Sequence, residues 1–217
     1  MIRPGEYVKD IFNKPAGTKV RVCGWVKTRR DSKGISFVQL SDGSCFRDLQ
    51  VVIDAGAIPD DVLKALTTGA SVRFSGEIVA SPAAGQAVEL KAEGAELFGA
   101  ADPQTYPLQK KGASFEFLRE IAHLKVRGNT FGAVYRIRHH ASWAIHKYFH
   151  EHGFNYVHTP IITASDCEGA GAMFAVSTLL NTKDGKFQLA SSNPEDDFFA
   201  KPPYLTVSGQ LEGETLA

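Results

Sequence analysis

The chain has 217 residues, of which 43% are hydrophobic and 22% charged, and its 24 basic residues balance 24 acidic ones. This length allows one ordinary domain and part of a second. The balanced charge excludes a protein that coats nucleic acid through bulk electrostatics, so any nucleic-acid contact must be local. The sequence has no apolar run of membrane-helix length and no apolar segment typical of a signal peptide, so we expect a cytoplasmic protein without membrane contact.

Alternation of apolar and polar residues predicts five strands in the first 100 residues. They are expected at residues 19 to 26, 35 to 40, 49 to 53, 70 to 78 and 87 to 93. A helix is predicted over residues 59 to 68, between the third and fourth strands. Three strands, a helix and two strands favour a five-stranded OB-fold barrel over residues 1–100.

The same alternation predicts which barrel side chains face outward. If Val38 and Leu40 point into the barrel, Phe37 and Gln39 point outward, and Gln50 does so on the next strand. An outward ring beside an amide and near the cationic Arg30 would be a platform for an unpaired base. Stacking of a base on such a ring is worth about 1 to 3 kcal/mol. A register slipped by one residue would instead place Phe37 in the core.

A hinge and two helices are predicted after the barrel. Residues 101–113 hold two prolines and no apolar periodicity, which is typical of a linker. Ser114 is a candidate N-cap for a short helix, and Asn129 or Thr130 for a long amphipathic helix that continues to His152.

Two histidines of the long helix, His146 and His150, have the one-turn spacing of paired metal ligands. The segment lacks the Glu that metallohydrolase helices place between their histidines, and no third ligand is evident. We therefore expect no metal site here.

The segment after the long helix carries a family resemblance. Gly153 suits the left-handed residue that closes a helix, and an edge strand is predicted over residues 156 to 162, because Pro160 cannot donate to a ladder. Gly153-Phe-Asn-Tyr-Val-His-Thr-Pro-Ile-Ile resembles motif 1 of the class II aminoacyl-tRNA synthetases, which builds their dimer interface. The resemblance implies a homodimer in the intact enzyme, with Gly153, Phe154 and Pro160 at the interface.

Two further stretches make the resemblance more specific. Residues 163 to 174 and Leu205-Thr-Val-Ser-Gly-Gln-Leu211 are similar to the asparaginyl-tRNA synthetases. In class IIb synthetases an OB domain grips the anticodon, stacks a base on a Phe and reads it with a Gln, and Arg30, Phe37 and Gln50 lie at matching positions. The middle anticodon base is uridine throughout this subgroup, and the resemblance leaves open which base each of the three residues contacts.

The family also implies an amino-acid pocket in the second domain. The resemblance makes Glu168 the acceptor for the α-ammonium of the substrate, and an ordinary surface-loop carboxylate is the alternative. Ser208 and Gln210 are expected side by side on a terminal strand, where neutral polar groups suit a zwitterion with an amide side chain. Glu214 is expected at the amide of asparagine.

Parts of the class II signature are missing from the chain. Motif 2, motif 3 and the magnesium ligands are expected beyond residue 217. Adenylation needs cations aimed at the transferring phosphate. We therefore expect residues 114–217 to form an incomplete class II catalytic domain built on an antiparallel sheet, with no catalytic residue and no bound ATP or Mg²⁺.

The resemblance implies that the intact enzyme joins asparagine to tRNA-Asn with ATP and Mg²⁺. One alternative is a non-catalytic protein that binds tRNA or single strands through its barrel. Another is a related synthetase for aspartate or lysine, which Val207-Ser-Gly-Gln210 disfavours.

Overall fold

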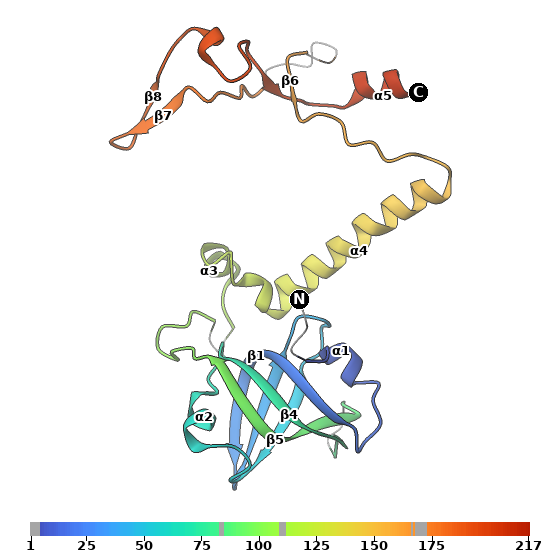
Figure 1. The fold of residues 1–217 in the computed structure, drawn as a ribbon, viewed down its shortest axis with the longest axis vertical. Coiled ribbons are helices and arrows are strands. Elements are labelled where there is room, and N and C mark those ends of the chain that lie inside the picture. The colour runs from blue at the N-terminus through green and yellow to red at the C-terminus, as the bar shows by residue number, and fades with distance from the viewer. Residues whose placement is uncertain (1–4, 83–84, 109–111, 166, 168–172) are drawn as a thin grey trace. The chain divides into compact units, whose positions relative to one another are not determined.

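The structure is a computed structural model that describes residues 5–82, 85–108, 112–165, 167 and 173–217 (Figure 1). The chain forms two compact units, Met1–Trp143 and Ala144–Ala217, whose boundary falls within a long helix. The domain limits expected at residues 100 and 113 stay a prediction.

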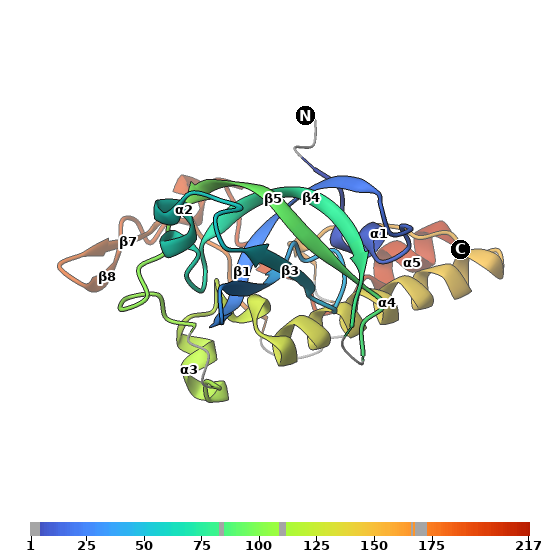
Figure 2. The same cartoon turned by 90° about the horizontal axis from the view of Figure 1, so that it is seen from below.

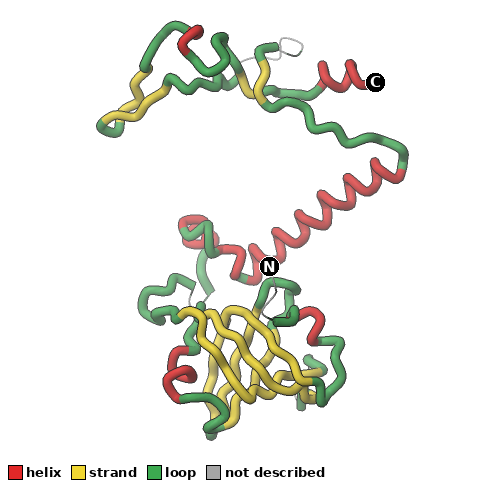
Figure 3. Tube along the Cα trace, viewed as in Figure 1, coloured by secondary structure: helices red, strands yellow, loops and turns green. Residues whose placement is uncertain are grey.

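The first unit is built around a closed barrel of five strands (Figures 1 and 3). The strands are β1 (Lys19–Ser32), β2 (Ile35–Ser41), β3 (Leu49–Asp54), β4 (Ser71–Ala80) and β5 (Val88–Gly99). Their order around the barrel is β1-β2-β3-β5-β4, and all pairs are antiparallel except β3 with β5. Helices α1 (Val8–Ile11) and α2 (Asp60–Ala65) lie on different sides of it (Figure 2). This arrangement confirms the predicted OB fold.

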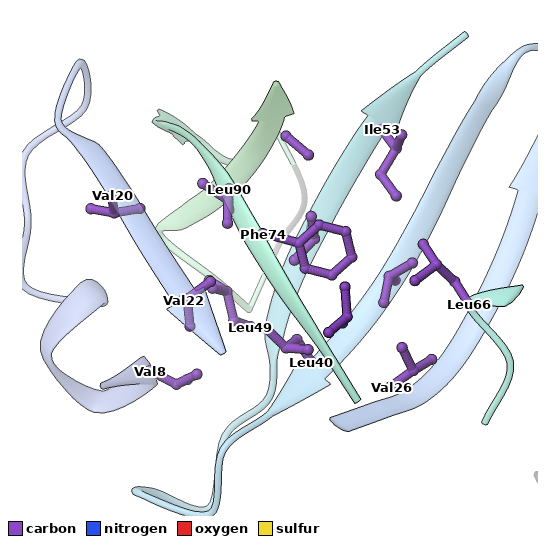
Figure 4. Packing of buried hydrophobic residues seen from close by; sticks show 14 of the residues in the cluster. Val8, Val20, Val22, Val26, Leu40, Leu49, Ile53, Leu66, Phe74 and Leu90 are labelled. Carbon is purple, nitrogen blue, oxygen red and sulfur yellow. The ribbon is translucent and has the colours of Figure 1, made fainter. Parts of the chain in front are cut away.

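The barrel core consists of apolar side chains from all five strands, with Phe74 fully buried among them (Figure 4). Val38 and Leu40 of β2 have no exposed surface, whereas Phe37 is only partly buried and lies outside this cluster. The observed register of β2 is therefore the one that turns Phe37 outward, and the slipped register is excluded.

Two strands are longer than their sequence pattern predicts, because bulges interrupt the alternation. In β1 the pairing with β2 shifts between Val26 and Thr28, so that Lys27 is an extra residue. In β5 the pairing with β4 shifts so that Glu93 is extra. Beyond each bulge the outward and inward positions exchange parity, which hides the second half of the strand from a period-two search.

Two predicted helices follow the barrel. α3 (Phe115–Glu120) begins at Ser114, whose Oγ accepts a hydrogen bond from the Phe117 amide at 3.2 Å, as predicted for an N-cap. After a 3-10 turn, η1 (Lys125–Arg127), α4 runs over Asn129–Glu151. The start of α4 contacts the barrel, because Asn129 Oδ1 accepts a hydrogen bond from Lys27 Nζ at 2.7 Å.

The C-terminal end of α4 lies in the second unit and closes with a Schellman motif. The Phe154 amide donates to the carbonyl of Phe149 at 3.0 Å, and the Gly153 amide to that of His150 at 3.1 Å. Gly153 has a φ of 82°, which confirms its predicted left-handed conformation. The rings of Phe149 and Phe154 pack edge to face, with centroids 5.4 Å apart.

The rest of the second unit has little regular structure (Figure 3). Its elements are β6 (Ile162–Thr163), β7 (Leu180–Lys183), β8 (Lys186–Leu189), the 3-10 turn η2 (Pro194–Asp196), β9 (Tyr204–Leu205) and α5 (Gln210–Leu216). The β6–β9 and β7–β8 pairs are antiparallel.

Two strand predictions in this unit were wrong. Residues 156 to 161 are irregular, and only Ile162 of the predicted edge strand pairs with another strand. The terminal strand β9 ends at Leu205, so Ser208 and Gln210 do not lie on it. The Ser208 Oγ accepts a hydrogen bond from the backbone N–H of Gln210 at 3.1 Å. This bond to a side chain turns the backbone into α5 instead of continuing the strand.

Candidate functional site

The outer face of the barrel brings Arg30 and Phe37 together. The two residues are register partners on β1 and β2, and the guanidinium carbon of Arg30 lies 4.7 Å from the centroid of the Phe37 ring. Without the bulge at Lys27, the residue opposite Phe37 would be Arg29. The bulge therefore selects which arginine covers the ring.

A polar row lies beside this pair and crosses four neighbouring strands. Thr28 pairs in register with Gln39, and Gln39 pairs with Gln50. Thr28 Oγ1 donates to Gln39 Oε1 at 2.7 Å, and Gln50 Nε2 donates to Glu89 Oε1 of β5 at 3.1 Å. Thus Gln50 lies on the same face as Phe37, as the alternation predicts, but Thr28 and Glu89 were not predicted to belong to this site.

Glu89 is a buried carboxylate, with only 4% of its surface exposed. Its Oε1 accepts hydrogen bonds from three donors: Gln50 Nε2, Ser81 Oγ at 2.5 Å and Gln86 Nε2 at 2.8 Å. These bonds compensate the cost of removing the carboxylate from water. The alternation of the sequence places Glu89 on the outer face of the barrel, between Val88 and the buried Leu90. Its hydrogen-bond partners were not predictable, because they depend on how the strands pair.

The neighbouring cations of β1 are engaged with carboxylates. Lys27 Nζ lies 3.0 Å from Asp48 Oδ2, and Arg29 forms a two-pronged pair with Asp31, both N···O distances being 2.9 Å. The Arg29 guanidinium and, second, the Ser36 hydroxyl lower the pKa of Asp31 below its usual value. The ion pairs of Lys27 and Arg29 thus stabilise the part of β1 that carries Arg30.

A second cluster joins three of the four predicted amino-acid ligands. The side-chain Nε2 of Gln210 donates to Glu214 Oε1 at 3.0 Å, one turn further along α5. The backbone N–H of Gln210 donates to Ser208 Oγ. Cys167, which is 6% exposed, donates through Sγ to Gln210 Oε1 at 3.3 Å. Glu168 lies outside the described residues. The contact with Cys167 was missed, because a lone cysteine has no spacing that predicts a polar partner.

The residues predicted to belong to motif 1 lie at the end of α4 and just after it. Gly153 and Phe154 form the Schellman closure, and Phe154 is 61% exposed. Pro160 is exposed in the irregular segment that precedes β6. None of these three residues carries a charge, so they present an uncharged surface.

The described residues include neither a cluster of metal ligands nor a membrane-spanning helix. Within those ranges, no group of three or more His, Cys, Asp or Glu side chains could hold a metal ion. None of the helices described is both long and apolar enough to span a membrane.

Comparison with known proteins shows which protein families the two parts of the chain match. Residues 20–98 match the family described as OB-fold nucleic acid binding domain, and residues 114–212 match the tRNA synthetases class II (D, K and N). Residues 114–212 of the chain therefore belong to a class II tRNA synthetase domain.

Within this class the chain is similar to asparagine–tRNA ligases. It is 54% identical to that of Solibacter usitatus, over 100% of the chain and 46% of the relative, and 56% identical to that of Parabacteroides distasonis, over 97% and 45%. The chain therefore spans about half the length of the curated relatives it matches.

Solved structures show the same fold. The asparaginyl-tRNA synthetase of Pyrococcus horikoshii in complex with asparaginyl-adenylate has a TM-score of 0.78 at 24% identity, covering 100% of this chain and 45% of that one. That of Entamoeba histolytica has a TM-score of 0.73 at 21% identity, covering 95% and 44%.

Proposed function

We propose that this chain supplies the anticodon-binding barrel and part of the asparagine pocket of an asparagine–tRNA ligase. The intact protein would activate asparagine with ATP and Mg²⁺ and transfer it to tRNA-Asn in the cytoplasm. The observation that carries the proposal is the outward ring of Phe37, which is covered by Arg30 on a closed OB barrel.

At the barrel, an unpaired base of the anticodon would stack on Phe37. Aromatic faces bind bases of any sequence through stacking, and single-stranded loops expose the bases for it. Gln50 would then recognise an edge of the stacked base, and Arg30 would supply positive charge near the backbone phosphates. The engaged cations Lys27 and Arg29 would contribute less, because their charges are already neutralised by Asp48 and Asp31.

At the second cluster, Glu214 would accept from the side-chain amide of asparagine, and Glu168 from its α-ammonium group. Ser208 would hold the start of α5, and Gln210 would keep Glu214 in place through their hydrogen bond. The family resemblance assigns Mg²⁺ and the nucleotide to the intact protein, and the described residues of this chain include no carboxylate or histidine cluster that fits a metal ion.

A homodimer of the intact protein is part of the same proposal. The end of α4 and the segment after it expose apolar side chains, among them Phe154 at 61%, Tyr156 at 74% and Ile161 at 59%. Contiguous exposed apolar surface is typical of protein interfaces. Gly153, Phe154 and Pro160 would lie within this interface.

The test is binding of a hairpin RNA that carries the asparagine anticodon in its loop. Fluorescence anisotropy is measured with the 217-residue chain, and the same stem closed by a short non-nucleotide linker is the control. Binding of the loop hairpin with at least tenfold preference over the control supports the proposal. Equal affinity for the two would show that the barrel binds no unpaired base and would refute it.

A further inference from the structure

The segment that the sequence predicts as a hinge contacts the barrel at two points. At its start, Thr67 Oγ1 donates a hydrogen bond to the carbonyl oxygen of Ala101 at 2.5 Å. Further on, the Tyr106 ring occupies the space beside Gly69, where a Cβ would lie 2.6 Å from the ring and could not be accommodated. Thr67 and Gly69 both belong to the turn between α2 and β4, so this part of the segment lies against the barrel.

Arg127 of η1 joins the same segment to the outer face of β1. The guanidinium carbon of Arg127 lies 4.6 Å from the centroid of the Trp25 ring, and its Nη1 donates to the Tyr106 hydroxyl at 3.2 Å. Trp25 is 41% exposed whereas its neighbour Val26 is buried, so the Trp25 ring lies on the outer face of the barrel. A single side chain thus contacts the barrel and the predicted hinge at the same time.

The first two turns of α4 are attached close to this contact. Lys27 Nζ, at the bulge of β1, donates to Asn129 Oδ1 at 2.7 Å. Arg136 Nη2 donates to the carbonyl oxygens of Gly43 and Cys45 at 2.6 and 2.9 Å, in the loop between β2 and β3. Asn129 and Arg136 are about two helical turns apart and therefore lie on the same side of α4. Because none of the residues described in α4 is buried, this attachment relies on polar bonds and not on an apolar core.

We propose that Arg127 and Arg136 fasten the predicted hinge and the start of α4 to the barrel, so that the barrel, η1 and the first two turns of α4 move as one rigid body. The predicted hinge is then a fixed arm and not a point of bending. Both arginines are positioning residues, because each acts through the groups that it holds and neither takes part in the contacts proposed for RNA or asparagine. All of these groups belong to the first unit, and their contacts do not depend on the proposed function of the barrel.

The two arginines are not expected to contribute equally. Arg127 is exposed, and a cation–π contact at an exposed site shifts an equilibrium about two- to fivefold. Arg136 is half-buried and donates to two carbonyls, and a hydrogen bond from a charged donor shifts an equilibrium about tenfold or more. Arg136→Gln should therefore release the start of α4 more than Arg127→Gln releases η1.

Nitrogen-15 NMR relaxation of the 217-residue chain tests whether these parts rotate together. The ratio R2/R1 of a segment rises with the time that the segment takes to rotate, so two segments of one rigid body have the same ratio. In the wild type, residues 115–136 are expected to have the same ratio as the barrel strands. In the double variant Arg127→Gln/Arg136→Gln, their ratio is expected to fall at least 1.5-fold below that of the barrel, because the released segment moves on its own.

A double variant of equal charge is the control. Arg119→Gln/Arg138→Gln removes two exposed positive charges from α3 and α4 and is expected to leave the ratio unchanged. Chemical shifts of the barrel residues verify that each variant is folded.

The consequence for the intact protein rests on the proposed function. Charging of tRNA-Asn would require that both units engage one tRNA, whereas formation of the adenylate would require no tRNA. Arg127→Gln/Arg136→Gln is therefore expected to raise the KM for tRNA at least fivefold and to leave asparagine-dependent pyrophosphate exchange within twofold of wild type. An equal loss of both activities would show a general effect on folding and would contradict the positioning role.

Three results would overturn the inference. The first is a lower ratio for residues 115–136 than for the barrel in the wild type, since the predicted hinge would then be flexible. The second is a wild-type ratio in the Arg127→Gln/Arg136→Gln variant. The third is binding of the anticodon hairpin by this variant more than twofold weaker than by its control, which would make the arginines RNA contacts and not positioning residues. Because the relaxation measurement contains no RNA, a failure of the proposed function would leave its result unchanged.

Discussion

The guanidinium carbon of Arg30 lies 4.7 Å from the centroid of the Phe37 ring, so the cation covers the surface on which we propose that a base stacks. A cation–π contact at an exposed site is worth about 0.5 to 1 kcal/mol. Stacking of a base on an aromatic ring is worth about 1 to 3 kcal/mol. A base can therefore displace Arg30 with a net gain, and the released guanidinium is then placed to meet a phosphate.

Replacement of Phe37 tests this exchange. Phe37→Ala is expected to weaken binding of an anticodon hairpin by about 1 to 3 kcal/mol, or about 5- to 150-fold, because the stacking surface is lost. Binding is measured by fluorescence anisotropy.

The barrel itself offers a matched control for Phe37. Phe98 is 50% exposed, and the guanidinium carbon of Arg73 lies 5.6 Å from the centroid of its ring. Phe98→Ala removes an equivalent arginine-covered ring at another place and should leave hairpin binding within twofold of wild type. Equal losses in both variants would mean that binding depends on barrel integrity and not on the platform.

The barrel fold was predictable because its pattern is local. Alternation marked parts of all five strands, and it placed Phe37 and Gln50 on the outer face. The partners of these side chains were not predictable in the same way. Glu89 is 39 positions from Gln50 along the chain, and which residues of β3 and β5 meet depends on how the barrel closes.

The second unit shows the limit of local patterns more clearly. Leu205-Thr-Val-Ser-Gly-Gln-Leu211 has the apolar content of a strand, yet only Leu205 lies in one. The hydrogen bond from the Gln210 amide to Ser208 Oγ begins α5 instead. A strand forms only where another strand pairs with it, and such a partner is not encoded in the segment itself.

The pH dependence of the Asp31 contact follows from its lowered pKa. Because the Arg29 guanidinium favours the ionised carboxylate, the pKa of Asp31 in the folded chain lies below the unfolded value of about 3.9. The contact therefore stabilises the fold at pH values above the unfolded pKa, and this contribution is lost as the pH falls through the folded pKa. Carbon-13 NMR titration of the Asp31 carboxyl is expected to give a midpoint below about 3.9.

Two variants check the cause of this shift. Arg29→Gln removes the guanidinium that is the main cause of the lowered pKa and should move the Asp31 midpoint upward, toward the value of a free Asp side chain. Arg21→Gln removes an exposed cation from the same strand but leaves the Arg29–Asp31 pair in place, so it should change the midpoint little. An unchanged midpoint in Arg29→Gln would contradict the assigned cause.

The left-handed conformation of Gly153 at the end of α4 predicts that any other residue at this position lowers the stability of the fold. Its φ of 82° is in the left-handed region, and apart from its neighbours in the chain no atom of the described residues lies within 4 Å of the position that a Cβ would occupy. Gly153→Ala is therefore expected to destabilise the second unit by about 1 kcal/mol through backbone strain alone. Thermal unfolding measures it. Gly112→Ala, at a position with equally open space and no positive φ, is the control, and an equal effect in both variants would exclude the strain argument.

The exposed apolar surface after α4 predicts self-association of the intact protein. Phe154 is 61% exposed and lies in the segment that resembles motif 1, so Phe154→Glu would place a charge in the proposed dimer interface. The expected result is a shift toward monomer, by a factor of at least ten in the dissociation constant, because an unpaired charge would be buried. Sedimentation equilibrium measures this constant. Phe187→Glu, on β8 and 82% exposed, is the matched control and should leave association unchanged. If both variants associate like the wild type, the surface around Phe154 is not the dimer interface.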